Sequence, residues 1–196
     1  MQYDRITRLL HLLIAAGVCV QLLVSEIMEE PESDHLADLF YGVHEYLGIA
    51  LFGLSSLYCL WAAIRKSETH LTQFFPWMSP SRYQPILEDV KRYIKSMLSL
   101  SLPDSNLPNP LAKAVQGAGL VVALMLGASG LLIYLYAPPG GELRGWLHLV
   151  EEVHEVFGGL LWIYLVAHLS MAVLHQLVGH SRIRDMFLFW KKPGDY

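Results

Sequence analysis

Charged residues and cysteines are scarce in this chain. Asp, Glu, Lys and Arg make up 16% of its 196 residues, whereas an average soluble domain has about 25%. The two cysteines, Cys19 and Cys59, are too few for a disulfide scaffold. The net charge of −4 provides no basic patch, so we expect no nucleic-acid partner. With 54% hydrophobic residues, the composition excludes a disordered chain and argues against an ordinary soluble domain.

Several cofactor motifs are missing as well. The sequence has no Cys-x-x-Cys-His motif, which excludes covalent haem attachment of the c type. It has no GxGxxG or Walker pattern, so no nucleotide site is visible. No Ser/His/Asp constellation can be identified either. Any haem in this chain would therefore lack the covalent attachment of c-type cytochromes.

Four long apolar stretches dominate what remains, and each reaches the roughly 20 residues that a membrane-spanning helix needs. They predict spans at residues 6–24, 39–64, 111–137 and 146–178, with one long polar segment at 65–110. The first stretch lacks a small-x-small cleavage site and precedes an acidic run, which favours a retained helix over a signal peptide. We predict an all-α integral membrane four-helix bundle, with residues 1–196 forming a single domain.

The basic residues predict the orientation of these spans. In a four-span arrangement, 13 of the 14 Lys and Arg residues fall on one side, and Arg144 alone falls on the other. The segment between the first two spans carries six acidic residues and no basic one. Because Lys and Arg accumulate in cytoplasmic loops, we expect both termini in the cytoplasm and the protein in a cytoplasmic membrane.

A short amphipathic helix is predicted inside the polar segment. Apolar residues recur at helical spacing from Ile86 to Leu98, and charged residues occupy the opposite face. These charged residues are Glu88, Asp89, Lys91, Arg92 and Lys95. Prolines along the segment prevent one continuous helix through it. The helix is either a tether on the membrane surface or a docking site for a partner.

Histidines carry the chemistry that this sequence offers. Polar side chains within membrane spans are costly and usually face the interior of the bundle. Five of the nine histidines fall within the predicted spans: His11, His44, His154, His168 and His175. One such residue is easily explained as a hydrogen bond between helices. Five of them indicate a cofactor or a pathway.

The spacing of these histidines predicts two stacked pairs. His154 and His168 are 14 residues apart, nearly four helical turns, so they face the same way and lie about 21 Å apart along the helix. His11 lies at the depth of His168, and His44 lies at the depth of His154. Two axial imidazoles in a helix bundle are typical of b-type haem. We therefore predict one haem iron between His11 and His168 near the inner surface, and another between His44 and His154 near the outer surface.

A short repeat accompanies one of these pairs. His44-Glu45-Tyr46-Leu47-Gly48 recurs as His154-Glu155-Val156-Phe157-Gly158. A glycine four residues after the histidine lies on nearly the same face and leaves room for a flat macrocycle. The alternative is that Gly48 and Gly158 allow close helix packing. Zinc is a poor fit, because structural zinc sites are usually tetrahedral with closely spaced ligands.

Taken together, these motifs resemble the bacterial cytochrome b561 family, which is similar to the b-type cytochrome subunits of nickel-iron hydrogenases. The resemblance is carried by Arg8-x-x-His11, by His44-x-x-x-Gly48, and by His154-Glu155 followed by His168 and His175. It covers all four spans and implies two haem b groups per chain. It also implies electron transfer between quinone or quinol and a redox partner. Arg8, one turn before His11, is then either a haem propionate partner or a cytoplasmic anchor.

Other functions stay open at this point. The resemblance includes quinone reductases that oxidise superoxide, but an anionic substrate gains from a positive outer surface, and here the outer segments are acidic apart from Arg144. That balance favours a basic partner such as a c-type cytochrome. A histidine-lined proton or metal conduit is a non-redox alternative, and a purely structural membrane subunit is another. His175 is an alternative axial ligand, a propionate contact or part of a quinone pocket.

Overall fold

The protein is described here from a computed structural model, which describes residues 4–28, 35–65, 74–78, 80–99, 110–138 and 143–177. Within these ranges the secondary structure is helical, with no strand. The helices are α1 (Arg5–Ile27), α2 (His35–Ile64), the short 3-10 helix η2 (Pro76–Met78), α3 (Pro80–Leu98), α4 (Pro110–Tyr136) and α5 (Trp146–Leu177). Four of them, α1, α2, α4 and α5, are long and apolar enough to cross a membrane. The four predicted spans are thereby confirmed.

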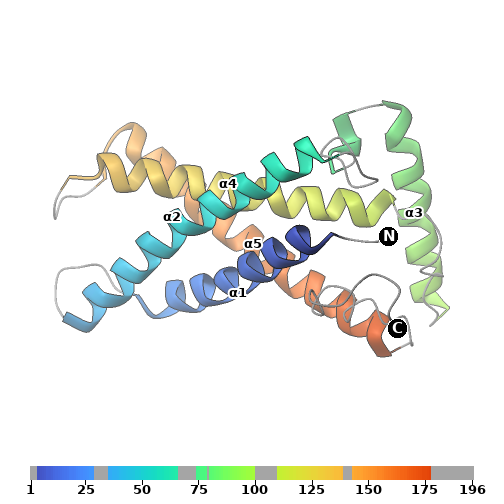
Figure 1. The fold of residues 1–196 in the computed structure, drawn as a ribbon, viewed down its shortest axis with the longest axis horizontal. Helices are drawn as coiled ribbons and strands as arrows, with labels where there is room; N and C mark the ends of the chain where they lie inside the picture. The colour runs from blue at the N-terminus through green and yellow to red at the C-terminus, as the bar shows by residue number, and fades with distance from the viewer. Residues whose placement is uncertain are drawn as a thin grey trace.

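The four long helices lie lengthwise beside one another (Figure 1). Helix α1 packs against α2, α2 packs against α4, and α4 packs against α5. Helix α3 stands across one end of this arrangement, beside the start of α4 (Figure 1). We call this the α3 end; α1 begins there, and α2 and α5 finish there. Successive spans therefore run in opposite directions, and the two histidines of each predicted pair come to similar depths.

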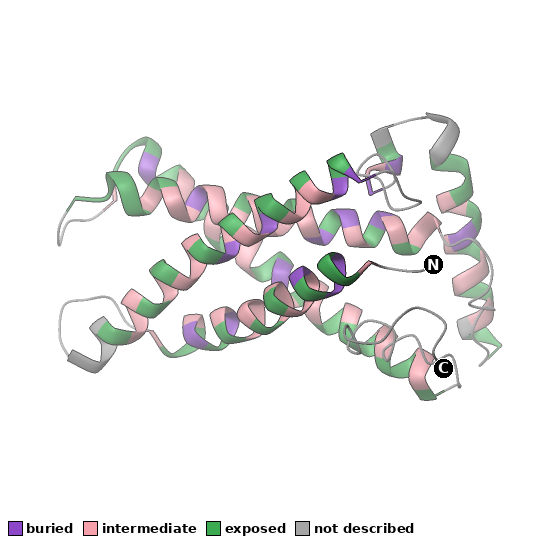
Figure 2. Ribbon diagram, in the orientation of Figure 1, coloured by how far each residue is buried: buried purple, intermediate pink, exposed green. Residues whose placement is uncertain are grey.

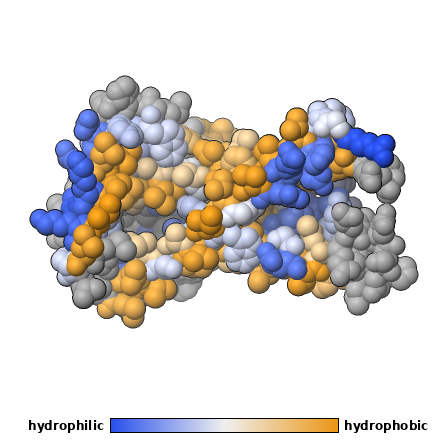
Figure 3. All heavy atoms as spheres, turned by 180° about the vertical axis from the view of Figure 1, so that it is seen from behind, coloured by the Kyte–Doolittle hydropathy of each residue, from blue (hydrophilic) through white to orange (hydrophobic). Residues whose placement is uncertain are grey.

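Large apolar side chains are exposed along all four long helices. Leu23, Leu60 and Ile163 are 61%, 56% and 68% exposed, respectively. Figure 2 shows that few residues along these helices are buried. Apolar residues cover much of the middle of the face in Figure 3, and hydrophilic ones gather toward both ends, including the α3 end. Such a surface is unfavourable in water, whereas hydrocarbon accepts it and the helices satisfy their own backbone polar groups. The chain is a multi-pass membrane protein.

The amphipathic helix predicted within 65–110 is present as α3 and begins earlier than the apolar pattern, at Pro80. Proline suits the first position of a helix, and Pro85, within the early turns, does not break it. One expectation was wrong. Asp89 does not lie on a solvated face; it is buried, pairs with Arg92, and accepts a hydrogen bond from the backbone N–H of Leu111 (3.2 Å). Because the first N–H groups of a helix lack partners, Asp89 caps α4 and ties α3 to it.

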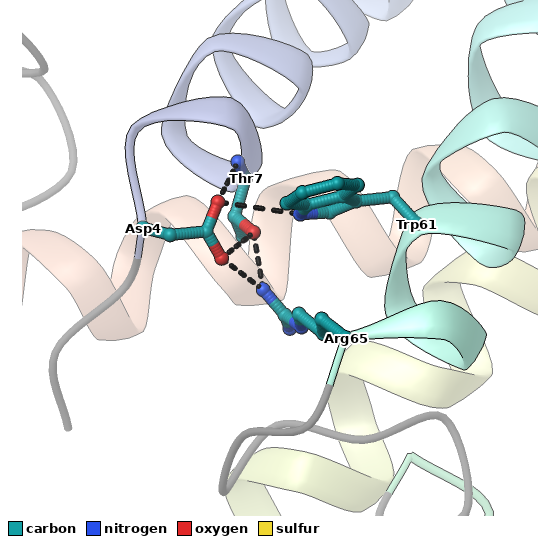
Figure 4. A network of polar contacts seen from close by, with 4 residues as sticks. All are labelled: Asp4, Thr7, Trp61 and Arg65. Atoms are coloured by element: carbon teal, nitrogen blue, oxygen red, sulfur yellow. Dashed lines mark hydrogen bonds and ion pairs between the residues drawn. The ribbon is translucent and has the colours of Figure 1, made fainter.

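A polar network fixes the start of α1 to the end of α2 (Figure 4). Asp4, the N-cap of α1, accepts hydrogen bonds from the backbone N–H and the hydroxyl of Thr7, each at 2.8 Å. It also accepts one from the Trp61 indole at 3.2 Å and pairs with Arg65 at 2.7 Å. Arg65 contacts the Thr7 hydroxyl as well. The network holds α1, which carries His11, in a fixed position against α2.

This network makes a pH-dependent contribution to stability. Partial burial raises the pKa of Asp4, but hydrogen bonds from Thr7 and Arg65 outweigh it and hold that pKa below its usual value. The stabilisation is therefore complete above the ordinary aspartate pKa of about 3.9 and is lost as pH falls through the lower folded-state value. Asp4→Ala is expected to cost about 1–2 kcal/mol at pH 7, mainly through the lost cap. Unfolding in mixed micelles at pH 7 and pH 3 measures it, and an equal cost at both pH values would contradict the account.

Candidate cofactor sites

The structure brings His11 of α1 and His168 of α5 together near the α3 end. Their ring centroids are 6.4 Å apart, and the ring planes are inclined by 54°. The Tyr164 ring, one turn earlier on α5, stacks on His168 at 5.6 Å with an angle of 11° between the planes. Gly119 of α4 makes room for Tyr164, since a Cβ atom at that position would overlap the tyrosine ring. Helices α1, α4 and α5 thus build this site jointly.

The second pair, His44 of α2 and His154 of α5, lies toward the opposite end. Its ring centroids are 6.2 Å apart with an interplanar angle of 74°. Each imidazole touches a polar side chain of a neighbouring helix at Nδ1. The Gln21 side-chain amide lies 3.0 Å from Nδ1 of His44, and the Ser129 hydroxyl lies 2.9 Å from Nδ1 of His154. Both imidazoles of the second pair are therefore hydrogen-bonded to side chains of neighbouring helices.

The separation of the rings in both pairs matches that of two imidazoles on one metal. A metal–imidazole nitrogen bond is about 2.0–2.1 Å long. With each ring centroid about 1.2 Å behind its nitrogen, two opposed ligands place their centroids about 6.4 Å apart. Within the described residues, no group of three or more His, Cys, Asp or Glu side chains that could hold a metal ion occurs. Each pair offers two nitrogen ligands, the number that b-type haem leaves to the protein.

At His44, the hydrogen bonds from Gln21 agree only in part with metal binding through Nε2. The Gln21 amide nitrogen donates to the His44 carbonyl oxygen at 2.9 Å and also faces Nδ1 of the same residue. An acceptor role for Nδ1 places the ring proton on Nε2, the nitrogen that would have to be unprotonated to bind a metal. The Gln21 oxygen, Oε1, is buried with no hydrogen-bond partner in the described part of the chain. Rotating the Gln21 amide by half a turn would direct this oxygen to a protonated Nδ1 and leave Nε2 of His44 unprotonated. The hydrogen bond to the His44 carbonyl oxygen would then be lost.

The two glycines of the repeat have different surroundings. A Cβ atom on Gly48 would lie 3.2 Å from the Gln21 amide nitrogen, so this glycine allows the α1–α2 contact. A Cβ atom on Gly158 would meet nothing within 4 Å. Close packing thus accounts for Gly48, and the open space beside Gly158 is compatible with a macrocycle.

The remaining candidate residues occupy distinct places. Arg8 is buried one turn before His11 and has contacts of its own. His175 donates its Nδ1 proton to the Met171 carbonyl oxygen at 2.8 Å. His148 lies 3.7 Å from Glu151 on an exposed turn of α5, away from both pairs. His35 begins α2, whereas His70 and His180 lie outside the described residues.

Sequence reasoning missed the residues that support the second pair. Gln21 and Ser129 each stand in an otherwise apolar stretch, and Ser129 is the one hydroxyl residue between positions 117 and 133. An isolated polar residue in a span signals an interior position, but it does not name its partner. Gly130, next to Ser129, lies against the same ring, since a Cβ atom there would lie 3.0 Å from Cε1 of His154.

Four long apolar helices with two histidine pairs between them define a class: helical membrane proteins that carry paired imidazoles within the bundle. Residues 2–188 match the family described as prokaryotic cytochrome b561. The chain belongs to this family, and it is a membrane b-type cytochrome that binds haem and transfers electrons. No curated protein and no solved structure gives a significant match.

Proposed function

We propose that the chain holds two haem b groups and carries electrons through the membrane between a quinone or quinol and a second redox partner. The observation that carries this proposal is the pair of imidazole–imidazole separations, 6.4 and 6.2 Å. Both pairs use the same helix, α5, at positions 14 residues apart, which places them about 21 Å apart along it. Two sites at different depths would extend electron transfer across most of a hydrocarbon core about 30 Å thick.

The chain contributes ligands, orientation and a water-poor environment. His11 and His168 would hold one haem, and His44 and His154 would hold the other. When bound, each haem would supply one-electron redox chemistry at its iron. Tyr164 orients His168 by stacking, and Ser129 and Gln21 orient the second pair. The apolar residues of the four spans lower the local dielectric constant, which is one means by which a protein tunes a haem potential.

The partners are proposed from chemistry and from family membership. Membrane lipid surrounds the apolar surface, and quinone is the redox partner that this phase would supply. The acidic residues between the first two spans favour a basic partner on that side, such as a c-type cytochrome. Reduction of the purified protein by a short-chain quinol, followed at the haem absorption bands, tests the first partner. An unreactive protein with intact haem would exclude quinol as the donor.

We further propose that the α3 end faces the cytoplasm, with both termini on that side. The support is the distribution of Lys and Arg, 13 of 14 on this side. A fluorescent protein fused to the C-terminus should fold and fluoresce, whereas alkaline phosphatase at the same position should be inactive. The reverse pattern would invert the orientation and with it the inner and outer assignment of the two sites.

Gly158 provides a direct test of where the macrocycle lies. Gly158→Leu is expected to reduce haem at the His44–His154 site by about tenfold or more, because the leucine would occupy space that only the cofactor needs. Gly159→Leu is the matched control, since its Cβ atom also meets nothing within 4 Å but points about 100° away around the helix. Haem content and the reduced spectrum measure both variants. Equal haem content in the two variants would show that no macrocycle lies against Gly158.

A further inference from the structure

Ser129 of α4 brings a hydroxyl group against the His44–His154 pair. It is 5% exposed, and the surrounding stretch of α4 is apolar. Its hydroxyl oxygen lies 2.8 Å from the Met125 carbonyl oxygen, 3.1 Å from the Leu126 carbonyl oxygen and 2.9 Å from Nδ1 of His154. All three contacts converge on one oxygen atom that has a single proton to donate.

The positions of these atoms decide which group donates. Two oxygen atoms at 2.8 Å repel each other unless a proton lies between them, so the Ser129 proton points back to the carbonyl oxygens of its own helix. The hydroxyl then has only lone pairs to offer His154. Nδ1 of His154 must therefore be the donor, and its ring proton lies on that nitrogen. This tautomer leaves Nε2 with a free lone pair, the form that binds a metal.

The neighbouring glycine shows how α4 brings the hydroxyl so close to the ring. A Cβ atom on Gly130 would lie 3.0 Å from Cε1 and 3.5 Å from Nδ1 of His154. A larger residue would push α4 away from the imidazole. The other pair is supported differently, by the stacked Tyr164 ring on His168. The serine contact is therefore specific to the His44–His154 site.

We infer that Ser129 is a positioning residue for the haem at this site: it fixes the metal-binding tautomer of His154 and lowers the midpoint potential of that haem relative to a site without the hydroxyl. The inference rests on the proposed dihaem function. Donation from Nδ1–H to an acceptor makes the imidazole a more basic ligand. A more basic ligand stabilises Fe(III) over Fe(II), so the potential falls. Ser129 contacts His154 and would act on the haem through this histidine.

The test is a redox titration of the purified holoprotein, wild type and three variants, followed at the haem absorption bands. Ser129→Ala removes the hydroxyl, Ser129→Thr keeps it, and Ser55→Ala changes another buried serine, on α2. Ser129→Ala should raise the midpoint potential of one of the two haem components in the titration. At a fixed applied potential, the Fe(II)/Fe(III) ratio of that component should rise by about tenfold. For a one-electron couple, this is about 59 mV. Ser129→Thr and Ser55→Ala should leave both components near their wild-type values.

Each outcome decides a separate point. Wild-type protein without two haems would contradict the proposed function itself. Two haems whose potentials do not change in Ser129→Ala would overturn the inference about Ser129 and leave the dihaem function standing. Equal shifts in Ser129→Ala and Ser129→Thr would also overturn it, since packing and not the hydroxyl would then be responsible.

A further variant keeps the inference testable if Ser129→Ala does not retain haem. Ser129→Cys replaces the hydroxyl by a thiol of similar shape and weaker acceptor strength. It should raise the midpoint potential of the same haem component, with a change in the Fe(II)/Fe(III) ratio smaller than tenfold. A wild-type potential in Ser129→Cys would contradict the inference.

Discussion

Replacing His44 or His154 with alanine is expected to reduce the haem content from two per chain to about one, with the same residual spectrum in both variants. Replacing His11 or His168 should remove the other haem and leave the complementary spectrum. The reason is that each iron would lose one of its two protein ligands, and the members of a pair act on the same metal. The ring centroids, 6.4 Å apart in one pair and 6.2 Å in the other, are the basis for assigning the members of each pair to one proposed site. Haem extraction and reduced-minus-oxidised spectra of the four variants measure the effect.

Two other histidines of α5 serve as controls. His148→Ala should retain both haems, because His148 lies on an exposed turn beside Glu151. His175→Ala should also retain both, because the ring that pairs with His11, at 6.4 Å between centroids, is that of His168. Loss of haem in His175→Ala with retention in His168→Ala would move the ligand about two turns along α5, to His175. Different residual spectra for His44→Ala and His154→Ala would show that they do not share an iron.

The second large effect is expected at Gly117, where α4 passes the segment before η2. A Cβ atom at this position would overlap the backbone carbonyl of Phe74. Phe74 is itself buried and packs against the Tyr58 ring at 6.3 Å, so its backbone has little freedom to retreat. Gly117→Ala is expected to destabilise the protein by about 3 kcal/mol, at the upper end of the usual range for overpacking. Unfolding in mixed micelles with a denaturing detergent measures the change.

Gly53→Ala is the matched control for this substitution. Gly53 lies in α2, and an added Cβ atom there meets nothing within 4 Å. Since alanine is a better helix former than glycine by about 1 kcal/mol, Gly53→Ala should be neutral or slightly stabilising. A stable Gly117→Ala variant would show that the contact between Phe74 and α4 is not fixed in the membrane-embedded protein.

The spans and the histidine pairs were predictable because both follow from properties that are local to the sequence. Apolar length alone defines a membrane helix, and a 14-residue step on one helix defines a shared face. Alternation of direction then places His11 at the depth of His168 and His44 at the depth of His154. The structure brings together the same two pairs.

The supporting contacts were not predictable because they depend on how each helix is rotated against its neighbours. Ser129 meets His154 from a different helix, 25 residues away in sequence, and Gln21 meets His44 across 23 residues. Arg65 reaches Asp4 across 61 residues. Asp89 shows the same limit: its place in an amphipathic pattern suggested a solvated face, whereas the start of α4 buries it.

The most direct test of the central claim is a dithionite-reduced minus oxidised absorption spectrum of the purified protein, with haem quantified per chain. Two haems per chain with sharp low-spin b-type bands are predicted, one for each histidine pair. Folded protein with a single haem would show that one of the pairs does not bind iron, and folded protein without haem would contradict the account as a whole.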